Sequence, residues 1–462
     1  MKPALVLQRI RLLRHTRGFI VRCPSITLLT MPRLRLNKTG RFPLILIAFG
    51  VLCFAFGGIA AHFRLAPYEW IHKAIVGGKA WQQKTEHIRF VANAPAPTKL
   101  AKPEVTHKEG AFEGLTLYVP SASTRAVLVD MEGNTLHEWR IPFSRIWPGH
   151  PHVRTPLPDR GITWFDAHVF PNGDLLVVHE GHGDAPWGYG LAKIDKDSKP
   201  LWTYDANVHH KMDIAANGDI YAISQKILNQ PVAFVPAPIM NDYLVILSPD
   251  GEVREEISLL EIILDSTWRS ILEEKYEGLR KKYDRLAEGD YLHTNSVHVL
   301  SEDMARHFPM FKPGQVLLSF RSLNLIAVLD IPSRKLVWGA EGSWRAQHHP
   351  RFSPDGTILF FDNKGGGRGR SLILRHNPAT GETAVAYEGS EEHPFFTDIR
   401  GMQQELPNGN ILITESDEGR LFEVTPRGEI VWEFLTPYRV RQKRLVITTG
   451  LRYLASELPF VK

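Results

Sequence analysis

The sequence predicts an all-β fold, a six-bladed β-propeller with one helical insertion, preceded by a single N-terminal transmembrane helix. Three observations support this prediction. A four-stranded hairpin pattern recurs six times, one highly charged stretch with helical spacing interrupts it, and an uncharged apolar run lies near the N-terminus. With 462 residues, of which 43% are hydrophobic, the chain is long enough for a large domain beside a membrane segment.

The repeat consists of two alternating parts. The first is an Asn-Gly or Asp-Gly turn followed by a strand, which is a hairpin signal, and it occurs at 171–178, 216–223, 354–361 and 407–414. The second is a strand, a polar turn and a strand that ends in an aromatic residue, at Trp139, Trp202, Trp338, Tyr387 and Trp432. Repeated four-stranded units of about 45 to 55 residues, with aromatic residues packed between them, are typical of β-propellers.

The six units differ at the two ends of the series and at one insertion. One unit ends near Trp139, and the others start near His168, His210, His293, His348 and Gly401. The first unit lacks its innermost strand, so we expect the C-terminal run 443–453 to supply that strand and close the ring. Residues 255–290 combine helical spacing of Leu, Ile and Trp with dense charge, which predicts a helical insertion, either a solvated decoration or a lid. The propeller is assigned to 110–455.

Charge divides the chain near its N-terminus. Residues 1–42 contain ten basic and no acidic residues, which leaves 45 basic and 50 acidic residues in the remainder of a chain whose formal net charge is +5. The mildly acidic remainder argues against nucleic acid as a partner. Residues 42–61 are uncharged and mostly apolar, long enough to cross a bilayer as a helix, and the basic residues before them place the N-terminus in the cytoplasm.

These features predict three N-terminal regions. They are a basic cytoplasmic tail at 1–41, a transmembrane anchor at 42–62, and a juxtamembrane helix with a Pro-rich linker at 63–109. Two alternatives stay open. Gly58-Ile59-Ala60 fits the cleavage site of a signal peptide, and translation from Met31 would give an equally good anchor.

Cysteine usage limits the chemistry of the exported part. The chain has two cysteines, Cys23 and Cys53, and both precede that part. We therefore expect no disulfide, no thiolate nucleophile and no zinc-thiolate site there. Other side chains must carry the chemistry.

Histidines recur where the innermost strands begin, and in a propeller these positions meet at the mouth of the central channel. Counting back eight residues from the turn glycine gives His210 and His348, each in a His-His pair with His209 and His349. The same count in the other units gives Asn295, Phe165 and Gly401, with His293 two residues before Asn295, while His168 and His298 share another register. A lone histidine is more often structural, but equivalent placement of several predicts a common site.

Two kinds of chemistry fit converging histidines. Neutral imidazoles are common metal ligands. No carboxylate accompanies these histidines at the equivalent positions, and the short His-x-x-x-His spacing is missing, so we expect no metal. An imidazole can instead accept an electrophilic group and pass it on, provided that cations and amide donors stabilise the negative charge. Arg321, at the end of the second strand of the His293 unit, is the arginine that this mechanism needs.

Several segments resemble the bacterial arylsulfate sulfotransferases. YLHTNSVHV at 291–299 resembles the family's His-x-Asn-Ser motif, LLSFRSLNLIAVLD at 317–330 resembles its Ser-x-Arg strand, and RAQHHPRFSPDGTILFFDN at 345–363 resembles its Gln-His segment. Residues 208–219 are similar to its His-His segment, and 401–434 to its last blade. The resemblance spans roughly residues 110–440.

The resemblance implies an enzyme that moves a sulfuryl group from an aryl sulfate ester to a phenolic acceptor through a transiently sulfated histidine, without a cofactor. His348 takes the place of that nucleophile, and His293, Arg321 and His210 are the other expected catalytic residues. The expected substrate-binding residues are Asn295, His209, His168 and Thr414. The implied location is the bacterial inner membrane, with a single pass and the catalytic domain in the periplasm.

The sequence leaves other interpretations open. Some family members carry a disulfide near the site and an additional N-terminal β-domain, which this chain lacks, so the donor and the acceptor do not follow from the resemblance. The role assigned to His210 can also fall to His209, and the role assigned to His348 can also fall to His349. The sequence also leaves open whether the protein forms a homodimer. The alternative functions are a non-catalytic propeller that binds a periplasmic partner and a quinone-cofactor dehydrogenase.

Overall fold

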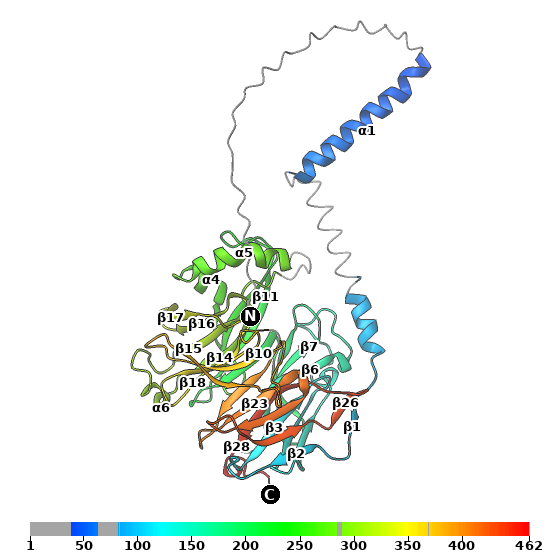
Figure 1. The fold of residues 1–462 in the computed structure, drawn as a ribbon. Helices are drawn as coiled ribbons and strands as arrows, with labels where there is room; N and C mark the ends of the chain where they lie inside the picture. The colour runs from blue at the N-terminus through cyan, green and yellow to red at the C-terminus, as the bar shows by residue number, and fades with distance from the viewer. Residues whose placement is uncertain (1–37, 63–81, 83, 284–288, 368, 462) are drawn as a thin grey trace, which may run out of the picture. The chain divides into compact units, whose positions relative to one another are not determined.

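The computed structural model describes residues 38–62, 82, 84–283, 289–367 and 369–461. The chain divides into two compact units, residues 1–74 and residues 75–462. Helix α1 (Lys38–His62) belongs to the first unit, and the described strands belong to the second (Figure 1). The predicted cytoplasmic tail lies, up to residue 37, outside the described residues.

Helix α1 contains the apolar run 42–61 that the sequence assigns to a membrane anchor. Its large apolar side chains between Leu44 and Ile59 are exposed. Within the part of the chain that the structure describes, we find no helix with both the length and the apolar character that crossing a membrane requires. The anchor at 42–62 therefore stays a prediction.

Six sheets of the second unit share one plan, in which each strand pairs in antiparallel order with the next strand of the sheet. Four sheets are continuous in the chain. They are β6 (Ile162–Val169), β7 (Leu175–Gly181), β8 (Gly188–Ile194) and β9 (Pro200–Tyr204); β10 (Asn207–Ile214), β11 (Ile220–Leu228), β12 (Ile239–Leu247) and β13 (Val253–Ser258); β14 (Thr294–Val299), β15 (Val316–Phe320), β16 (Leu325–Asp330) and β17 (Lys335–Glu341); and β18 (His348–Phe352), β19 (Ile358–Asp362), β20 (Leu372–His376) and β21 (Thr383–Glu388).

The other two sheets combine distant parts of the chain. One contains β22 (Met402–Glu405), β23 (Ile411–Glu415), β24 (Arg420–Val424) and β25 (Ile430–Leu435), with β2 (Glu104–His107) beside β25. The other has the order β28 (Ile447–Tyr453), β3 (Leu115–Pro120), β4 (Arg125–Val129) and β5 (Thr135–Arg140). Strand β28 pairs with β3, which confirms the prediction that the C-terminal run 443–453 supplies the missing innermost strand.

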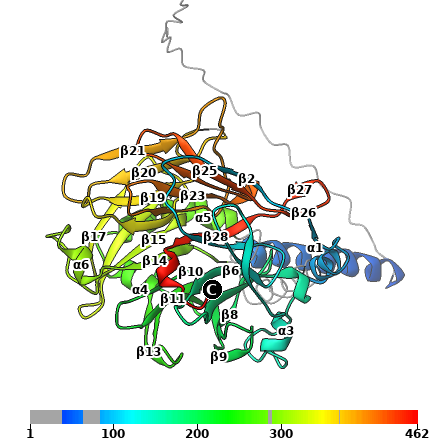
Figure 2. The same cartoon turned by 90° about the horizontal axis from the view of Figure 1, so that it is seen from below.

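Hydrophobic side chains on both faces of each sheet hold neighbouring sheets together. In β7, Leu175 and Val177 contribute to one cluster, and Leu176 and Val178 contribute to the next, as the two-residue period of a strand requires. Such clusters join each sheet to its neighbour in chain order, and the sheet of β22 to the sheet of β28, so the packing is circular. Figure 2 shows β6, β10, β14 and β28 towards the middle and β9, β13, β17 and β21 at the outside. The fold is therefore all-β and propeller-like.

The turn glycines and the aromatic residues of the repeat have separate structural roles. Gly173 has a φ of +87°, which glycine adopts without steric clash. Trp139 is buried, and its indole N–H donates a hydrogen bond to the carbonyl oxygen of Gly173 in the next sheet (2.9 Å). The indole of Trp432 donates in the same way to the carbonyl oxygen of Met131 (2.9 Å). These contacts confirm the predicted packing of aromatic residues between units.

Two segments differ from the sequence-based expectation. The linker at 63–109 contributes β1 (Thr98–Lys99), which pairs with β26 (Tyr438–Val440), and β2, so both strands are bound to the C-terminal part of the chain. The insertion at 255–290 begins as strand β13, and the Ser258 side chain then accepts a hydrogen bond from the Glu261 N–H to cap the first helix. Residues 284–288 of the insertion lie outside the described residues.

The insertion and the connections add short helices. The insertion holds α4 (Leu259–Leu264), whose Leu259, Leu260, Ile262 and Ile263 are buried between the sheets of β10 and β14, and then α5 (Arg269–Tyr283). The remaining elements are α3 (Phe143–Ile146), α6 (Glu302–Ala305), a helix at 84–92, β27 (Lys443–Arg444) beside β26, and 3₁₀ turns at Asp159–Gly161, Arg321–Leu323, Ser416–Glu418 and Ala455–Glu457.

Candidate active site

Bulges in the innermost strands direct side chains to the centre of the molecule. A β-bulge leaves residues out of the strand pairing and turns them away from the regular faces of the sheet. The unpaired residues are Phe165 in β6, His210 and Lys211 in β10, Asn295 in β14, His349 and Pro350 in β18, and Thr448 in β28. These five sheets, together with Arg400 and Gly401 just before β22, contribute to one small central cavity, which is lined by Phe165, Lys211, Asn295, His348, His349, Arg400, Gly401 and Thr448.

The backbone around this cavity is strained. His210, His293, His349 and Arg400 have φ values of +57°, +49°, +53° and +70°, a region that bulky residues rarely adopt. Such conformations persist only where the surrounding structure imposes them, and they concentrate at functional sites. The strain coincides with the histidine count at His210 and falls next to counted positions at His349 and Arg400, beside His348 and Gly401.

Hydrogen bonds fix the tautomer of His348. Its Nδ1 lies 2.9 Å from the carbonyl oxygen of Ala346 and 2.7 Å from Oδ1 of Asn363. The Asn363 amide is oriented because its Nδ2 donates to the carbonyl oxygens of Thr397 (3.0 Å) and Arg400 (2.8 Å). Since both partners of Nδ1 are acceptors, Nδ1 carries the proton, and the lone pair of the neutral ring is on Nε2.

The surroundings of His348 keep its ring neutral and place positive charge beside it. Burial lowers the pKa of His348 well below its ordinary value, and the positive charges of Arg321 and His293 lower that pKa further. The Arg321 side chain makes no hydrogen bond or ion pair with any residue that the structure describes. A neutral imidazole thus lies beside a guanidinium group without a counter-ion, which suits an anionic ligand.

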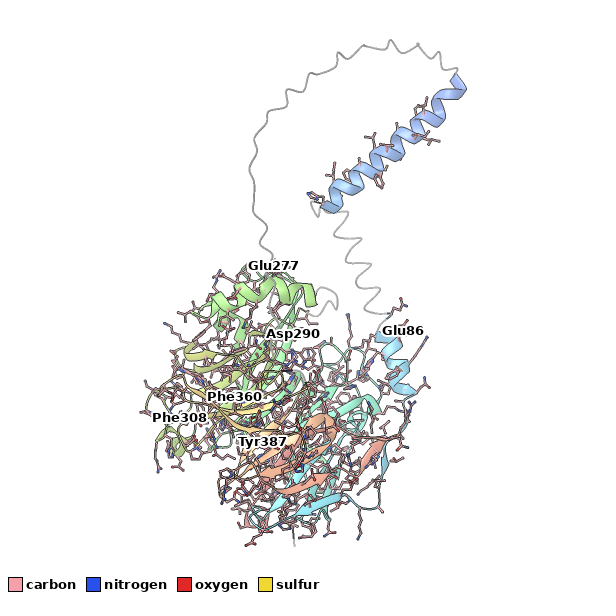
Figure 3. All side chains as sticks on the ribbon, in the orientation of Figure 1. Glu86, Glu277, Asp290, Phe308, Phe360 and Tyr387 are labelled. Carbon is pink, nitrogen blue, oxygen red and sulfur yellow. The ribbon has the colours of Figure 1, made fainter. Side chains whose placement is uncertain are left out.

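His293 and His210 complete a cluster of rings. The Nδ1 of His293 lies 2.5 Å from Oδ2 of the buried Asp290, which orients the ring and stabilises positive charge on it; Asp290 is labelled in Figure 3, on the side of the sheets that carries α5. The ring centroids of His210 and His293 are 5.1 Å apart. Burial lowers the pKa of His210 well below its ordinary value, and positive charge on His209, His293, His348 and Arg321 has the same effect. The structure therefore brings together the four residues expected to be catalytic.

The sequence left open whether His209 or His210 holds the predicted role, and in the structure the two rings are hydrogen-bonded to each other. Their Nδ1 atoms are 2.7 Å apart, and Nε2 of His209 lies 3.5 Å from Oδ1 of Asp242. Both histidines are buried, as is Asp242. The ring centroids of His209 and His210 are 5.0 Å apart, so His209 also belongs to the ring cluster.

A buried carboxyl group accompanies these two histidines. Glu180 Oε1 accepts a hydrogen bond from the His210 backbone N–H (2.6 Å). Burial raises the pKa of Glu180 to about 8, although this hydrogen bond and the charges of Arg400 and Lys211 act in the opposite direction. At neutral pH, the carboxyl group is therefore mostly protonated.

Among the described residues, Glu180, His209 and His210 form a group close enough to hold a metal ion. The sequence-based argument considered carboxylates only at the positions equivalent to the histidines and therefore did not find Glu180, which comes from β7 and reaches β10 from the neighbouring sheet. In the structure, the two ring nitrogens hydrogen-bond to each other and the carboxyl group accepts from the His210 N–H. Nearby Arg400 and Lys211 add positive charge, so the group fits a proton-sharing chain better than a cation site.

The structure places two expected substrate-binding residues inside the site and two outside it. Asn295 lines the cavity, and His209 belongs to the ring cluster. His168 does not line the cavity; its ring packs near Phe170 and Tyr453. Thr414 also does not line it, and its buried hydroxyl lies near Gly450 without a partner among the described residues.

Sequence analysis missed several residues of the site, although one signal was available for two of them. The residue five positions after the start of the second strand is Glu180, Gln225, Arg321, Asn363 or Ser416 in the respective sheets. The sequence analysis places Arg321 at the end of a second strand, and the equivalent position in two other sheets holds Glu180 and Asn363. Trp187, whose ring lies 5.1 Å from that of His293, and Asp242 carry no comparable signal.

Fold and site together define a propeller-like protein whose centre holds neutral imidazoles beside unpaired positive charge, a site for group transfer on an anionic ligand. The chain belongs to the arylsulfotransferase (ASST) family, whose model matches residues 166–437. This match confirms the resemblance inferred from the motifs.

Other comparisons give weaker similarities. No curated protein matches the chain. A solved protein of unknown function from Bacteroides caccae is 11% identical, with 73% of this chain and 98% of that chain covered and a TM-score of 0.46. A streptogramin B lyase structure is 13% identical, with 73% and 89% covered and a TM-score of 0.39. At these values, neither similarity bears on function.

Proposed function

We propose that this protein is an arylsulfotransferase that carries the sulfuryl group on Nε2 of His348 between an aryl sulfate ester and a phenol, at the centre of a six-bladed ring. One observation carries the proposal. His348 donates through Nδ1 to two oxygens, which leaves its lone pair on Nε2, beside the unpaired Arg321 guanidinium. Family membership supports the class of substrate.

In the first half-reaction, the Nε2 lone pair of His348 attacks the sulfur atom. The N–S bond forms, the bond between sulfur and the aryl oxygen breaks, and its electron pair leaves with that oxygen. A phenol has a pKa of about 10, so protonation of the departing oxygen lowers the barrier. Protonated His293, held by Asp290, supplies that proton, and Arg321 stabilises the charge on the sulfuryl oxygens.

In the second half-reaction, the oxygen of the acceptor phenol attacks the sulfur atom of sulfated His348. The phenol gives its proton to His293, the N–S bond breaks, and the electron pair returns to Nε2. The site thus ends with the protons with which it began. Two successive displacements at one histidine predict ping-pong kinetics.

Trp187 is the side chain best placed to hold the aryl group. Its ring centroid lies 5.1 Å from His293, 5.9 Å from His209 and 6.1 Å from His210. Its buried indole N–H has no partner among the described residues. An aromatic face beside the imidazoles can stack on a phenyl ring while the N–H donates to an oxygen of the ester.

Mass spectrometry after incubation with 4-nitrophenyl sulfate tests the proposal. We expect one sulfuryl adduct on the peptide that contains His348, and its loss when phenol is added. The His348→Asn variant should lose both the adduct and the transfer to phenol. His307→Asn, which changes an exposed histidine, is the matched control and should retain both. Transfer by the His348→Asn variant, or an adduct on another residue, contradicts the mechanism.

We also propose that residues 42–61 anchor the protein in the inner membrane with the N-terminus in the cytoplasm and the β-structure in the periplasm. The exposed apolar side chains of α1 and the basic residues before it support this location. Alkaline extraction of membranes should leave the full chain in the pellet and release a chain that begins at residue 63. N-terminal sequencing of the mature protein distinguishes an anchor from a cleaved signal peptide.

A further inference from the structure

Two cationic side chains, Lys211 and Arg400, line the central cavity together with His348. Lys211 lies in β10 and Arg400 lies just before β22, and the family resemblance assigns a role to neither residue. Because the cavity contains the proposed nucleophile, a cation that faces it without a partner would attract the anionic part of a substrate. The hydrogen bonds of the two side chains decide which cation is available.

Lys211 is fully engaged. Its Nζ lies 2.9 Å from Oδ1 of Asp166, 3.0 Å from the carbonyl oxygen of Thr448 and 2.8 Å from Oγ1 of Thr449. An ammonium group has three N–H donors, so these three oxygens satisfy it. Asp166 also balances its charge. Lys211 therefore holds three sheets together and has no donor left for a ligand.

Arg400 is not engaged. Its guanidinium makes no hydrogen bond or ion pair with any residue that the structure describes, and its Nε is buried. The group lies over the ring of Phe165, 5.7 Å from the centroid, which positions it without using its donors. A buried arginine with unused N–H groups is energetically unfavourable unless a ligand supplies the acceptors.

One residue ties Arg400 to His348. The Asn363 amide donates to the Arg400 carbonyl oxygen (2.8 Å) and accepts from His348 Nδ1 (2.7 Å). The left-handed backbone of Arg400 is thus held by the same side chain that fixes the tautomer of the nucleophile. A strained backbone at Arg400 is expected if the function requires its side chain to point into the cavity.

We propose that Arg400 binds the sulfuryl oxygens of the substrate, so that the transferred group lies between the guanidinium groups of Arg321 and Arg400 while His348 attacks it. This inference rests on the proposed function and adds a substrate-binding residue to it. The raised pKa of Glu180 supports it, because a neutral carboxyl group at Glu180 leaves Asp417 as the remaining acidic group whose charge acts on Arg400, and no ion pair joins Asp417 to Arg400. Two guanidinium groups match the three equatorial oxygens over which the charge of the transferred group is spread.

Three variants of the full chain test the inference. Arg400→Asn removes the charge and tolerates a positive φ, Arg400→Lys keeps the charge but loses the forked donors, and Arg427→Gln changes an exposed arginine as a control. Calorimetry with inorganic sulfate measures binding without turnover, and initial rates with 4-nitrophenyl sulfate give KM and kcat.

We expect Arg400→Asn to weaken sulfate binding and to raise the donor KM by about 10- to 100-fold, the effect of losing a charge-assisted contact. Arg400→Lys should weaken sulfate binding and raise the donor KM, each by at least about threefold, and Arg427→Gln should leave both quantities unchanged. Wild-type values in Arg400→Asn, or in Arg400→Lys if the first variant does not fold, overturn the inference. If Arg400→Asn weakens sulfate binding although the wild type forms no sulfated His348, the anion site stands and the proposed reaction fails.

Discussion

Replacing Glu180 with glutamine should remove a pH dependence from the stability of the protein. Burial raises the pKa of Glu180 in the native state to about 8, from 4.5 for an ordinary glutamate. Between these values, the native state holds a proton that the unfolded state has released. The free energy of unfolding contributed by this residue is therefore complete below pH 4.5 and decreases as the pH rises to 8.

The size of the effect follows from that difference. At about 1.4 kcal/mol per unit, a rise from 4.5 to about 8 corresponds to roughly 4 kcal/mol at pH 8, where the native group is half ionised, and to roughly 3 kcal/mol at pH 7. Glutamine keeps the oxygen that accepts the His210 N–H and does not titrate. Because every other group titrates alike in both proteins, the difference between variant and wild type isolates Glu180.

Urea unfolding at pH 5 and pH 8 measures this difference. We expect Glu180→Gln to match the wild type closely at pH 5 and to be more stable by several kcal/mol at pH 8, with sulfuryl transfer retained at pH 7. An equal difference at both pH values refutes the reasoning. It would mean that Glu180 is ionised in the native state and balances Arg400, which would also remove one support from the anion site proposed there.

Three further predictions follow from the site and its supports. Asn363→Ala should lower kcat by about 100-fold with little change in the donor KM, because the His348 ring loses an acceptor that orients it. Asn363→Asp keeps an acceptor oxygen and should recover part of the rate in the same assay. Equal kcat values for Asn363→Ala and the wild type would contradict the orienting role. Trp187→Leu should raise KM more for naphthyl than for phenyl sulfates, since a larger ring gains more from stacking, whereas an equal increase for both esters argues against stacking. Burial lowers the pKa of His179 to about 3, so the free energy of unfolding should decrease as the pH falls below 6.5, by about 3 kcal/mol from this ring at pH 4.5. Urea unfolding at pH 6.5 and pH 4.5 should show a smaller decrease for His179→Gln, which keeps an acceptor for the Trp164 indole N–H. An identical decrease in variant and wild type would show that the His179 ring titrates normally.

Much of the fold is visible in the sequence because the repeat is local. An Asn-Gly turn such as that at Gly173 determines a hairpin within a few residues, and alternating apolar residues determine which faces are buried. Strands β1 and β2 are not predictable in this way. They are short, and they form because β26 and β25, more than 300 residues away in the chain, offer free edges.

The site is predictable in its membership and not in its geometry. Counting from the turn glycine treats His210 and His348 as equivalent. Strand pairing instead leaves His210 and His349 unpaired, because two residues are left out of the pairing in both β10 and β18. Leaving out two residues keeps the two-residue alternation of the strand in phase, so the apolar pattern does not reveal the bulges of β10 and β18. Glu180 was missed for a related reason, since it acts across two sheets.

Strand β28 has a consequence for the order in which the protein matures. It supplies Thr448 and Thr449, which accept two of the three hydrogen bonds of Lys211. A ribosome that has produced every residue before Ile447 has made each proposed catalytic side chain, yet the cavity still lacks one wall and Lys211 lacks most of its partners. Synthesis of strand β28 thus decides when the reaction centre becomes complete.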